Sequence, residues 1–240
     1  MRSSAAAGGI AAIVFGLAGL VWTALQLAQV TLGFEDTDNP AVTLAYLRGH
    51  LDNYLQQGLA MFVMALALTI LVFAVWDLFA GRSSSFGLRT ISTFGLVAAA
   101  CFFLFGVLRY GVRPLLHIDG LNPSWGEAAY LVQQIAGVHG FAPAAIVTMC
   151  GWAVGVGVLG YRSRALPRWL ALLAVIPLFR LVSILGPLLP PDALPGELWI
   201  VSLISIPGSM VWFILLGAVL LRRGLRSTAV PAVMPEIAPA

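Results

Sequence analysis

The sequence predicts an all-α polytopic membrane protein, a bundle of six transmembrane helices with both termini in the cytoplasm. Of its 240 residues, 60% are hydrophobic and only 10% are charged, whereas roughly 25% are charged in a soluble globular chain. The apolar residues also form long blocks without charges, which is typical of membrane spans. Bilayer burial is the interpretation that accounts for both observations.

The first three blocks predict one span each. Between Arg2 and Glu35 lie 32 uncharged residues, whereas a single crossing needs about 20. We expect a retained span over 9–32, since the apolar region of a signal peptide has only about 7 to 15 residues. The next two spans are predicted over 55–78 and 89–110.

The last three spans are predicted over 130–161, 168–189 and 198–222. The fourth apolar block is longer than one hydrocarbon thickness, so we expect its first turns to project beyond the membrane core. Pro143 predicts a kink in it, because proline removes a helix hydrogen bond. The fifth block is interrupted once, by Arg180.

Arginine distribution predicts the orientation, because positively charged residues are retained on the cytoplasmic side. With the amino terminus inside, the cytoplasmic segments hold nine arginines and the outer loops hold three. We therefore expect both termini inside. Residues 1–226 are predicted to form one transmembrane domain, and the proline-rich segment 227–240 a disordered cytoplasmic tail.

Composition also bears on partners. The chain contains no lysine, and its arginines do not cluster with aromatic residues, so no nucleic-acid partner is expected. Cys101 and Cys150 lie inside apolar blocks and predict packed thiols rather than a disulfide framework. The lipid bilayer is the partner that the composition predicts, and a homo-oligomer or a larger membrane complex stays open.

Arg180 is the charged residue that the membrane tolerates least. It lies 12 positions after Arg168, about 18 Å into the bilayer at the rise of a helix. Arginine near the centre of a span costs roughly 2.5 to 3.5 kcal/mol on insertion scales, so we expect its side chain to face the bundle interior. It either bonds to carbonyls and hydroxyls of neighbouring helices or binds an anion with its fork of donors.

Most other intramembrane polar side chains fall in the outer halves of the predicted spans. Helices with amides at similar depth would line a cavity open to the outside, with Arg180 at its floor and Arg109 at its rim. The alternative is that these side chains are solvated in the headgroup zone. The candidate ligand-binding residues are Gln26, Gln29, Gln57, Gln133, Gln134, His139, Arg109 and Arg180.

The three histidines, His50, His117 and His139, all fall on the same outer side. Metal sites on helices usually use histidines three or four residues apart, and these are not so spaced. A metal site assembled across loops is the alternative to solvated histidines. No cofactor follows from the sequence.

The stretch from Gln133 to Pro177 resembles the bacterial six-span membrane proteins of domain-of-unknown-function family 4386. The resemblance rests on His139 early in the fourth span, on the glycine-rich end of that span, and on a basic turn made of Gly160, Tyr161, Arg164, Pro167, Arg168 and Leu170. That family has no established activity. The resemblance therefore implies an architecture and a bacterial inner-membrane location, but no chemistry.

Three hypotheses for the function remain. The first is a membrane protein, not predicted to be an enzyme, whose outward-facing polar pocket binds or passes a small anionic or amphiphilic ligand. The second is a metal- or haem-binding redox protein that uses His139 with His50 or His117. The third is a structural subunit of a larger membrane complex, which packs through the glycines of the fourth span.

Overall fold

Every element described in the computed structural model is helical, which confirms the all-α class. The structure describes residues 2–33, 40–81, 83–111, 122–185 and 196–228. Inside a bilayer a helix satisfies its own backbone hydrogen bonds, and few other structures can. The long apolar blocks of this chain therefore fold as long helices.

Five helical segments are long and apolar enough to cross a membrane, so the chain is a multi-pass membrane protein. Four are single helices at predicted spans: α1 (Arg2–Thr31), α3 (Leu51–Phe79), α4 (Ser85–Gly111) and α10 (Gly196–Thr228). The fifth joins three elements: α6 (Pro123–Gln133), η1 (Gln134–Phe141) and α7 (Ala142–Arg162). A short helix, α2 (Pro40–Gly49), forms in the segment that was predicted to be a loop between the first two spans.

The segment predicted over 168–189 differs from a single span. Its described part forms α8 (Arg168–Leu173), the 3-10 helix η2 (Ile176–Arg180) and α9 (Leu181–Leu185). Pro177 accounts for the break, because it has no N–H for the helix ladder and clashes with the preceding turn. Around it the N–H of Leu178 bonds to the third residue back, Val175, at 3.0 Å, as in a 3-10 helix.

The long α6–η1–α7 segment changes its pitch next to the predicted kink at Pro143. Over η1 the backbone is π-helical, and the N–H of Ala142 bonds to the carbonyl of Gly137, five residues back. Gly137 is buried, and a Cβ there would lie 3.0 Å from the ring of Phe105 on α4. The wider turn therefore lies where this segment approaches α4 closely.

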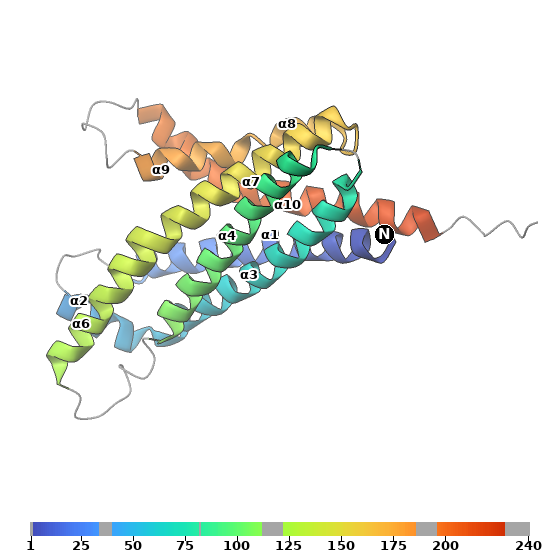
Figure 1. The fold of residues 1–240 in the computed structure, drawn as a ribbon. Helices are drawn as coiled ribbons and strands as arrows, with labels where there is room; N and C mark the ends of the chain where they lie inside the picture. Colours follow the sequence, from blue (N-terminus) through green and yellow to red (C-terminus); the bar gives the residue numbers. More distant parts are fainter. Residues whose placement is uncertain (1, 34–39, 82, 112–121, 186–195, 229–240) are drawn as a thin grey trace, which may run out of the picture.

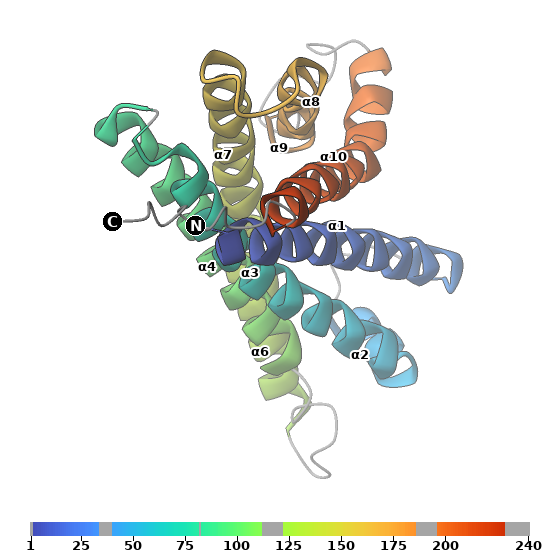
Figure 2. The ribbon, with the colours of Figure 1, turned by 90° about the vertical axis from the view of Figure 1, so that its right-hand side faces the viewer.

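The first and last helices pack antiparallel along their length. Gly9 faces Gly217, Gly16 faces Met210, and Gly224 faces Ala6. The start of α1 and the end of α10 therefore lie at the same end of the molecule (Figures 1 and 2). Within the tail predicted over 227–240, Ser227 and Thr228 are helical, and the rest lies outside the described residues.

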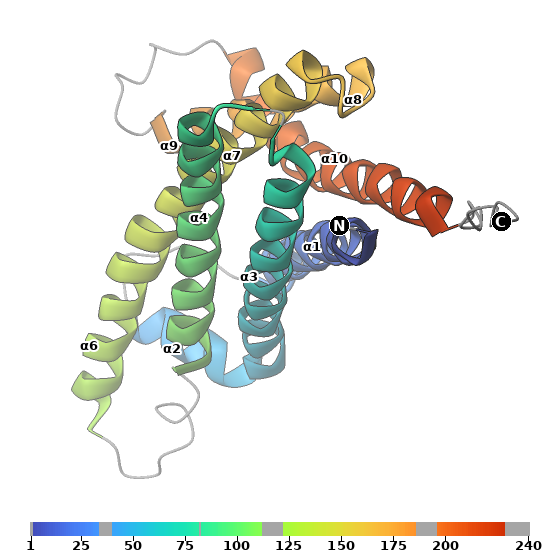
Figure 3. The same cartoon turned by 45° about the vertical axis from the view of Figure 1, so that its right-hand side comes forward.

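The two ends of the bundle carry different elements (Figure 3). One end holds α2 and the start of α6, and we name it the amide end for the side chains described below. The other holds the α3–α4 turn, the α7–α8 turn and the end of α10. We name it the arginine-rich end after Arg89, Arg162, Arg164, Arg168, Arg222 and Arg223.

Aromatic side chains fill the centre of the bundle. Phe213 of α10 stacks on Trp152 of α7 at 5.8 Å and lies 4.3 Å from Phe15 of α1, measured between ring centroids. Trp212 donates its indole N–H to the carbonyl of Leu170 in α8 at 2.9 Å. These contacts hold α1, α7, α8 and α10 together, while large apolar side chains cover the outer surface where lipid would lie.

We predict that Gly217→Ala lowers the stability of the bundle. The added Cβ would lie 2.5 Å from the carbonyl oxygen of Gly9, so α1 and α10 must move apart. Overpacking of this kind costs about 1–3 kcal/mol. Thermal unfolding in mild detergent should show a lower midpoint than wild type. Gly49→Ala is the control, because its Cβ meets nothing within 4 Å. Equal midpoints for the two variants would contradict the close α1–α10 contact.

Candidate functional site

A bridge of amide side chains joins α1 to α3 at the amide end. The Gln57 side chain is fully buried, and its Nε2 donates to Gln29 Oε1 at 2.8 Å and to Asn53 Oδ1 at 2.7 Å. Asn53 lies one helical turn before Gln57 and donates to the backbone carbonyl of Leu25 at 3.3 Å. Because unpaired amides are costly in an apolar interior, this bridge fixes how α3 is rotated against α1.

A second set of polar contacts joins α3 to the α6–η1 segment. The Tyr54 hydroxyl donates to Gln133 Oε1 at 2.7 Å, and both side chains are buried. Gln134 Nε2 donates to the hydroxyl of Tyr130 at 2.6 Å, one turn earlier on the same segment. These bonds place two tyrosine rings and two glutamines around one space.

Arg109, near the end of α4, points its side chain into the same region. It is 6% exposed, and its guanidinium carbon lies 4.9 Å from the ring centroids of both Tyr54 and Phe105. The two rings stabilise the cation through their π-faces. Its Nε and Nη1 atoms are buried and have no hydrogen-bond partner among the described residues. Arg109 thus retains two unused donors.

These groups enclose a cavity of about 180 Å³. Its lining comes from six elements and consists of Gln26, Gln29, Leu47, Tyr54, Arg109, Tyr130, Gln134 and Val138. No carboxylate is among these lining residues, so the guanidinium is their one formal charge. Gln26 and Gln134 are only half-buried, which makes their side the accessible side of the cavity.

Two further buried polar atoms near the cavity lack partners in the described part of the chain. They are the donor Gln133 Nε2 and the acceptor Gln57 Oε1. Together with Arg109, three of the four unused buried atoms here are donors. A ligand with acceptor oxygens and a negative charge would satisfy them, whereas a cation would be repelled.

The short helix α2 covers this region from outside. The Tyr46 hydroxyl donates to the backbone carbonyl of Gln29 at 3.0 Å, and its ring stacks on His50 at 4.2 Å. Burial raises the pKa of Tyr46, so its hydroxyl stays protonated as a donor. Leu44 and Leu47 pack with Tyr54 and Tyr130 into a small apolar cluster. The helix therefore closes one wall of the cavity.

The structure separates the two arginines that the sequence placed in one cavity. Arg180 is buried but lies in a smaller space of about 30 Å³ with mostly apolar lining, including Trp22 and Met61. Phe105 lines that space and also contacts the Arg109 guanidinium. Arg109, expected at the rim, lies inside the larger cavity, and Arg180, expected at its floor, does not line it.

Some of the other predicted site residues lie at the cavity, and others lie away from it. Gln26, Gln29 and Gln134 line the cavity, and Gln57 and Gln133 bond to residues around it. His139 is exposed on η1 and His50 stacks on Tyr46, while His117 lies outside the described residues. Among the residues that the structure describes, no group of three or more histidine, cysteine or acidic side chains could hold a metal ion.

Sequence reasoning missed three polar residues of the site, Asn53, Tyr54 and Tyr130, and the apolar lining residues Leu47 and Val138. Gln57 follows Asn53 by four residues and Tyr54 by three, so both share a face of α3 with it. That spacing was a usable signal for a polar face on the second span. Tyr130 precedes Gln133 by three residues and Gln134 by four, so the same spacing was a signal for this residue too.

The fold and the cavity define a class: a multi-pass helical membrane protein with a buried arginine, unpaired among the described residues, in a polar cavity near one end of its bundle. The chain matches no protein-family model, no curated protein and no solved structure. The resemblance to family 4386 stays a prediction.

Proposed function

We propose that the cavity at the amide end binds or passes a small anionic or amphiphilic ligand. The observation that carries the proposal is the buried Arg109 guanidinium, whose Nε and Nη1 have no partner among the described residues. An uncompensated buried charge costs several kcal/mol, and a protein retains one more readily when a ligand completes it. An acid group of the ligand would supply the missing acceptor oxygens.

The lining also favours an anion that has an apolar part. Leu47 and Val138 offer apolar surface, and the rings of Tyr54 and Tyr130 offer flat faces. Gln26 and Gln134 add amides on the accessible side. An organic acid with one carboxylate and a short apolar body matches this distribution better than a fully hydrated inorganic ion does.

The proposal also covers the number of times the chain crosses the membrane and the side on which its termini lie. The start of α1 and the end of α10 lie at one end of the bundle, so an even number of crossings is needed. The broken segment α8–η2–α9 would return the chain and make the sixth crossing. With the arginine-rich end in the cytoplasm of a bacterium, as the positive-inside rule favours, both termini are inside and the cavity faces outward.

A structural-subunit role stays a prediction. The glycine face of α7 that suggested it is covered within the chain: a Cβ at Gly151 would meet Phe94, and one at Gly155 would meet Ile91, both on α4. A partner would have to bind elsewhere.

Titration calorimetry with a matched pair of probes tests the ligand proposal. Benzoate carries a carboxylate on a small apolar ring, and benzyl alcohol has nearly the same shape without charge. The purified protein in mild detergent should bind benzoate and should not measurably bind benzyl alcohol at the same concentrations. Equal heats for both compounds would show that any binding is apolar, and no heat for either would refute the proposal for organic acids.

The topology is tested by labelling with a membrane-impermeant thiol reagent on intact cells. In a Cys101→Ala, Cys150→Ala background, Val42→Cys on α2 and Ser84→Cys at the α3–α4 turn both place a thiol at an exposed position. We predict that Val42→Cys is labelled from outside and that Ser84→Cys is labelled only after the cells are opened. The reverse pattern would invert the orientation, and equal labelling would contradict α3 as a span.

A further inference from the structure

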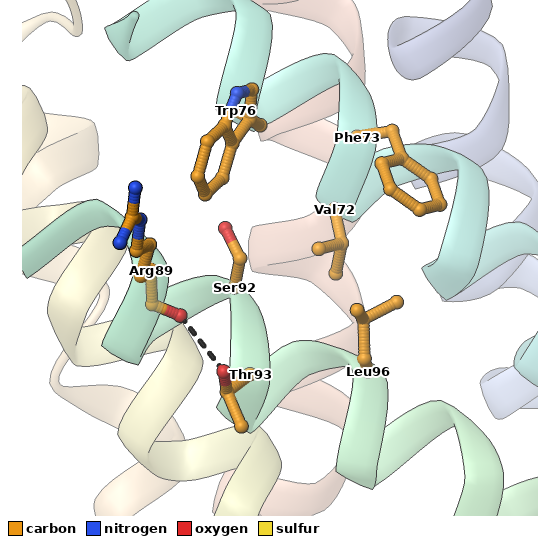
Figure 4. A pocket seen from close by; sticks show the side chains of 7 residues that line it. All are labelled: Val72, Phe73, Trp76, Arg89, Ser92, Thr93 and Leu96. Carbon is orange, nitrogen blue, oxygen red and sulfur yellow. Dashed lines mark hydrogen bonds between the residues drawn. The ribbon is translucent and has the colours of Figure 1, made fainter. Parts of the chain in front are cut away.

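A groove between α3 and α4 lies at the arginine-rich end, away from the amide-end cavity. Its volume is about 290 Å³. The groove is lined by Val72, Phe73 and Trp76 of α3 and by Arg89, Ser92, Thr93 and Leu96 of α4 (Figure 4). Phe73 is largely exposed on the outer surface of the bundle, so the groove opens toward lipid.

The groove changes from polar to apolar along the helix axis. Arg89 and Trp76 lie close to the ends of their helices, next to the α3–α4 turn. Leu96 lies seven residues after Arg89, about 10 Å further along the bundle at the rise of a helix. Val72 and Phe73 lie about one turn deeper than Trp76. The polarity therefore falls in the direction in which a membrane becomes hydrocarbon.

Two polar side chains of the groove, Arg89 and Ser92, have no bonding partner within the described part of the chain. Arg89 is exposed, and neither it nor Asp77, the residue after Trp76, forms an ion pair with a described residue. Ser92 is 8% exposed as a residue, and its hydroxyl has no hydrogen bond to any described residue. By contrast, Thr93 bonds back to the carbonyl of Arg89 at 2.9 Å. Figure 4 shows the Ser92 hydroxyl pointing into the space beside Trp76.

We propose that this groove is a binding site for one anionic phospholipid. The phosphate accepts hydrogen bonds from Arg89 and Ser92, Trp76 lies at the level of the glycerol, and an acyl chain follows Val72, Phe73 and Leu96. A free phosphate would leave the apolar part of the groove empty. A zwitterionic headgroup would bring a second cation beside Arg89. The site is independent of the proposed function of the amide-end cavity.

The test is retention of added lipid by the intact protein in native mass spectrometry from mild detergent. Phosphatidylglycerol and phosphatidylcholine with identical chains are the probes. We expect one phosphatidylglycerol to be retained about fivefold more tightly than phosphatidylcholine, the effect of about one arginine charge near a membrane surface. Equal retention of the two lipids by the wild-type protein would overturn the proposal.

Two variants test whether the preference for phosphatidylglycerol arises in the groove. Arg89→Gln should remove most of the preference for phosphatidylglycerol. Arg168→Gln, which removes an exposed arginine at the same end but outside the groove, should keep it. Both arginines are exposed, so neither variant is expected to disturb folding. If the two variants lose the preference equally, the attraction belongs to the whole charged surface and the groove is not a site.

Fluorescence quenching provides a readout of the groove itself. Phosphatidylglycerol with brominated chains should quench Trp76 when it occupies the groove. The quenched fraction should therefore fall in Trp76→Phe relative to wild type, at equal lipid concentration. An unchanged quenched fraction would place the lipid elsewhere and overturn the proposal.

Discussion

Arg109→Leu should weaken benzoate binding by about 100-fold or more while leaving the bundle folded. Hydrogen bonds to charged groups contribute about 1.5–3 kcal/mol each, and two donor atoms of Arg109 have no partner in the part of the chain that the structure describes. The fold should tolerate the change, because replacing a buried charge with an apolar side chain of similar volume is often neutral or stabilising. Lost contacts with Tyr54 and Phe105 would offset part of any gain in stability. Calorimetry and thermal unfolding of the same sample measure both effects.

Arg48→Leu is the matched control, because Arg48 is exposed on α2 at the same end of the molecule. It removes the same charge without touching the cavity lining and should bind benzoate as wild type does. Arg109→Lys should fall between wild type and Arg109→Leu, since lysine keeps the charge but not the planar fork of donors. If Arg109→Leu binds benzoate normally, the proposed site is wrong. If it unfolds, Arg109 is structural.

Trp212→Ala should produce the largest loss of stability in the bundle. Trp212 is 1% exposed, packs against Trp152 and Phe213, and donates to the Leu170 carbonyl. Removing a buried aromatic side chain costs about 3–5 kcal/mol, and the unpaired carbonyl adds to this. The break at Pro177 leaves α8 with only six residues, so it depends on this anchor. We expect a much lower unfolding midpoint in detergent.

Trp169→Ala makes the corresponding deletion on α8 itself, where the side chain is 49% exposed. Its midpoint should stay close to that of wild type. Similar losses in Trp169→Ala and Trp212→Ala would mean that tryptophan packing in general, and not the α10–α8 anchor, sets the stability of this region.

The long helices were predictable because length and charge decide them. Four predicted spans correspond to α1, α3, α4 and α10, and the predicted fourth span to the α6–η1–α7 segment. The break in the predicted fifth span was missed, because apolar length alone does not show where a proline will divide a helix. The pitch of η1 also depends on contact with Phe105, which is a tertiary effect. The count of six crossings stays a prediction.

The site was predictable in its composition but not in its arrangement. The outer glutamines were found because amides are costly in a membrane, and the cavity gathers several of them. The sequence could not show which of the two arginines lies in the larger polar cavity. Sequence gives the depth of Arg109 and Arg180 along their helices, but not the rotation of each helix or the ring of Phe105 between the two spaces.

The most direct test of anion binding by Arg109 is a crystal structure with 4-bromobenzoate, located by the anomalous scattering of its bromine. We expect bromine density inside the amide-end cavity, with the carboxylate about 2.7–2.9 Å from the guanidinium of Arg109. Leu47 and Val138 should contact the ring. Bromine density only at other positions, with Arg109 paired to a carboxylate of the protein itself, would contradict the central claim that this arginine is kept for a ligand.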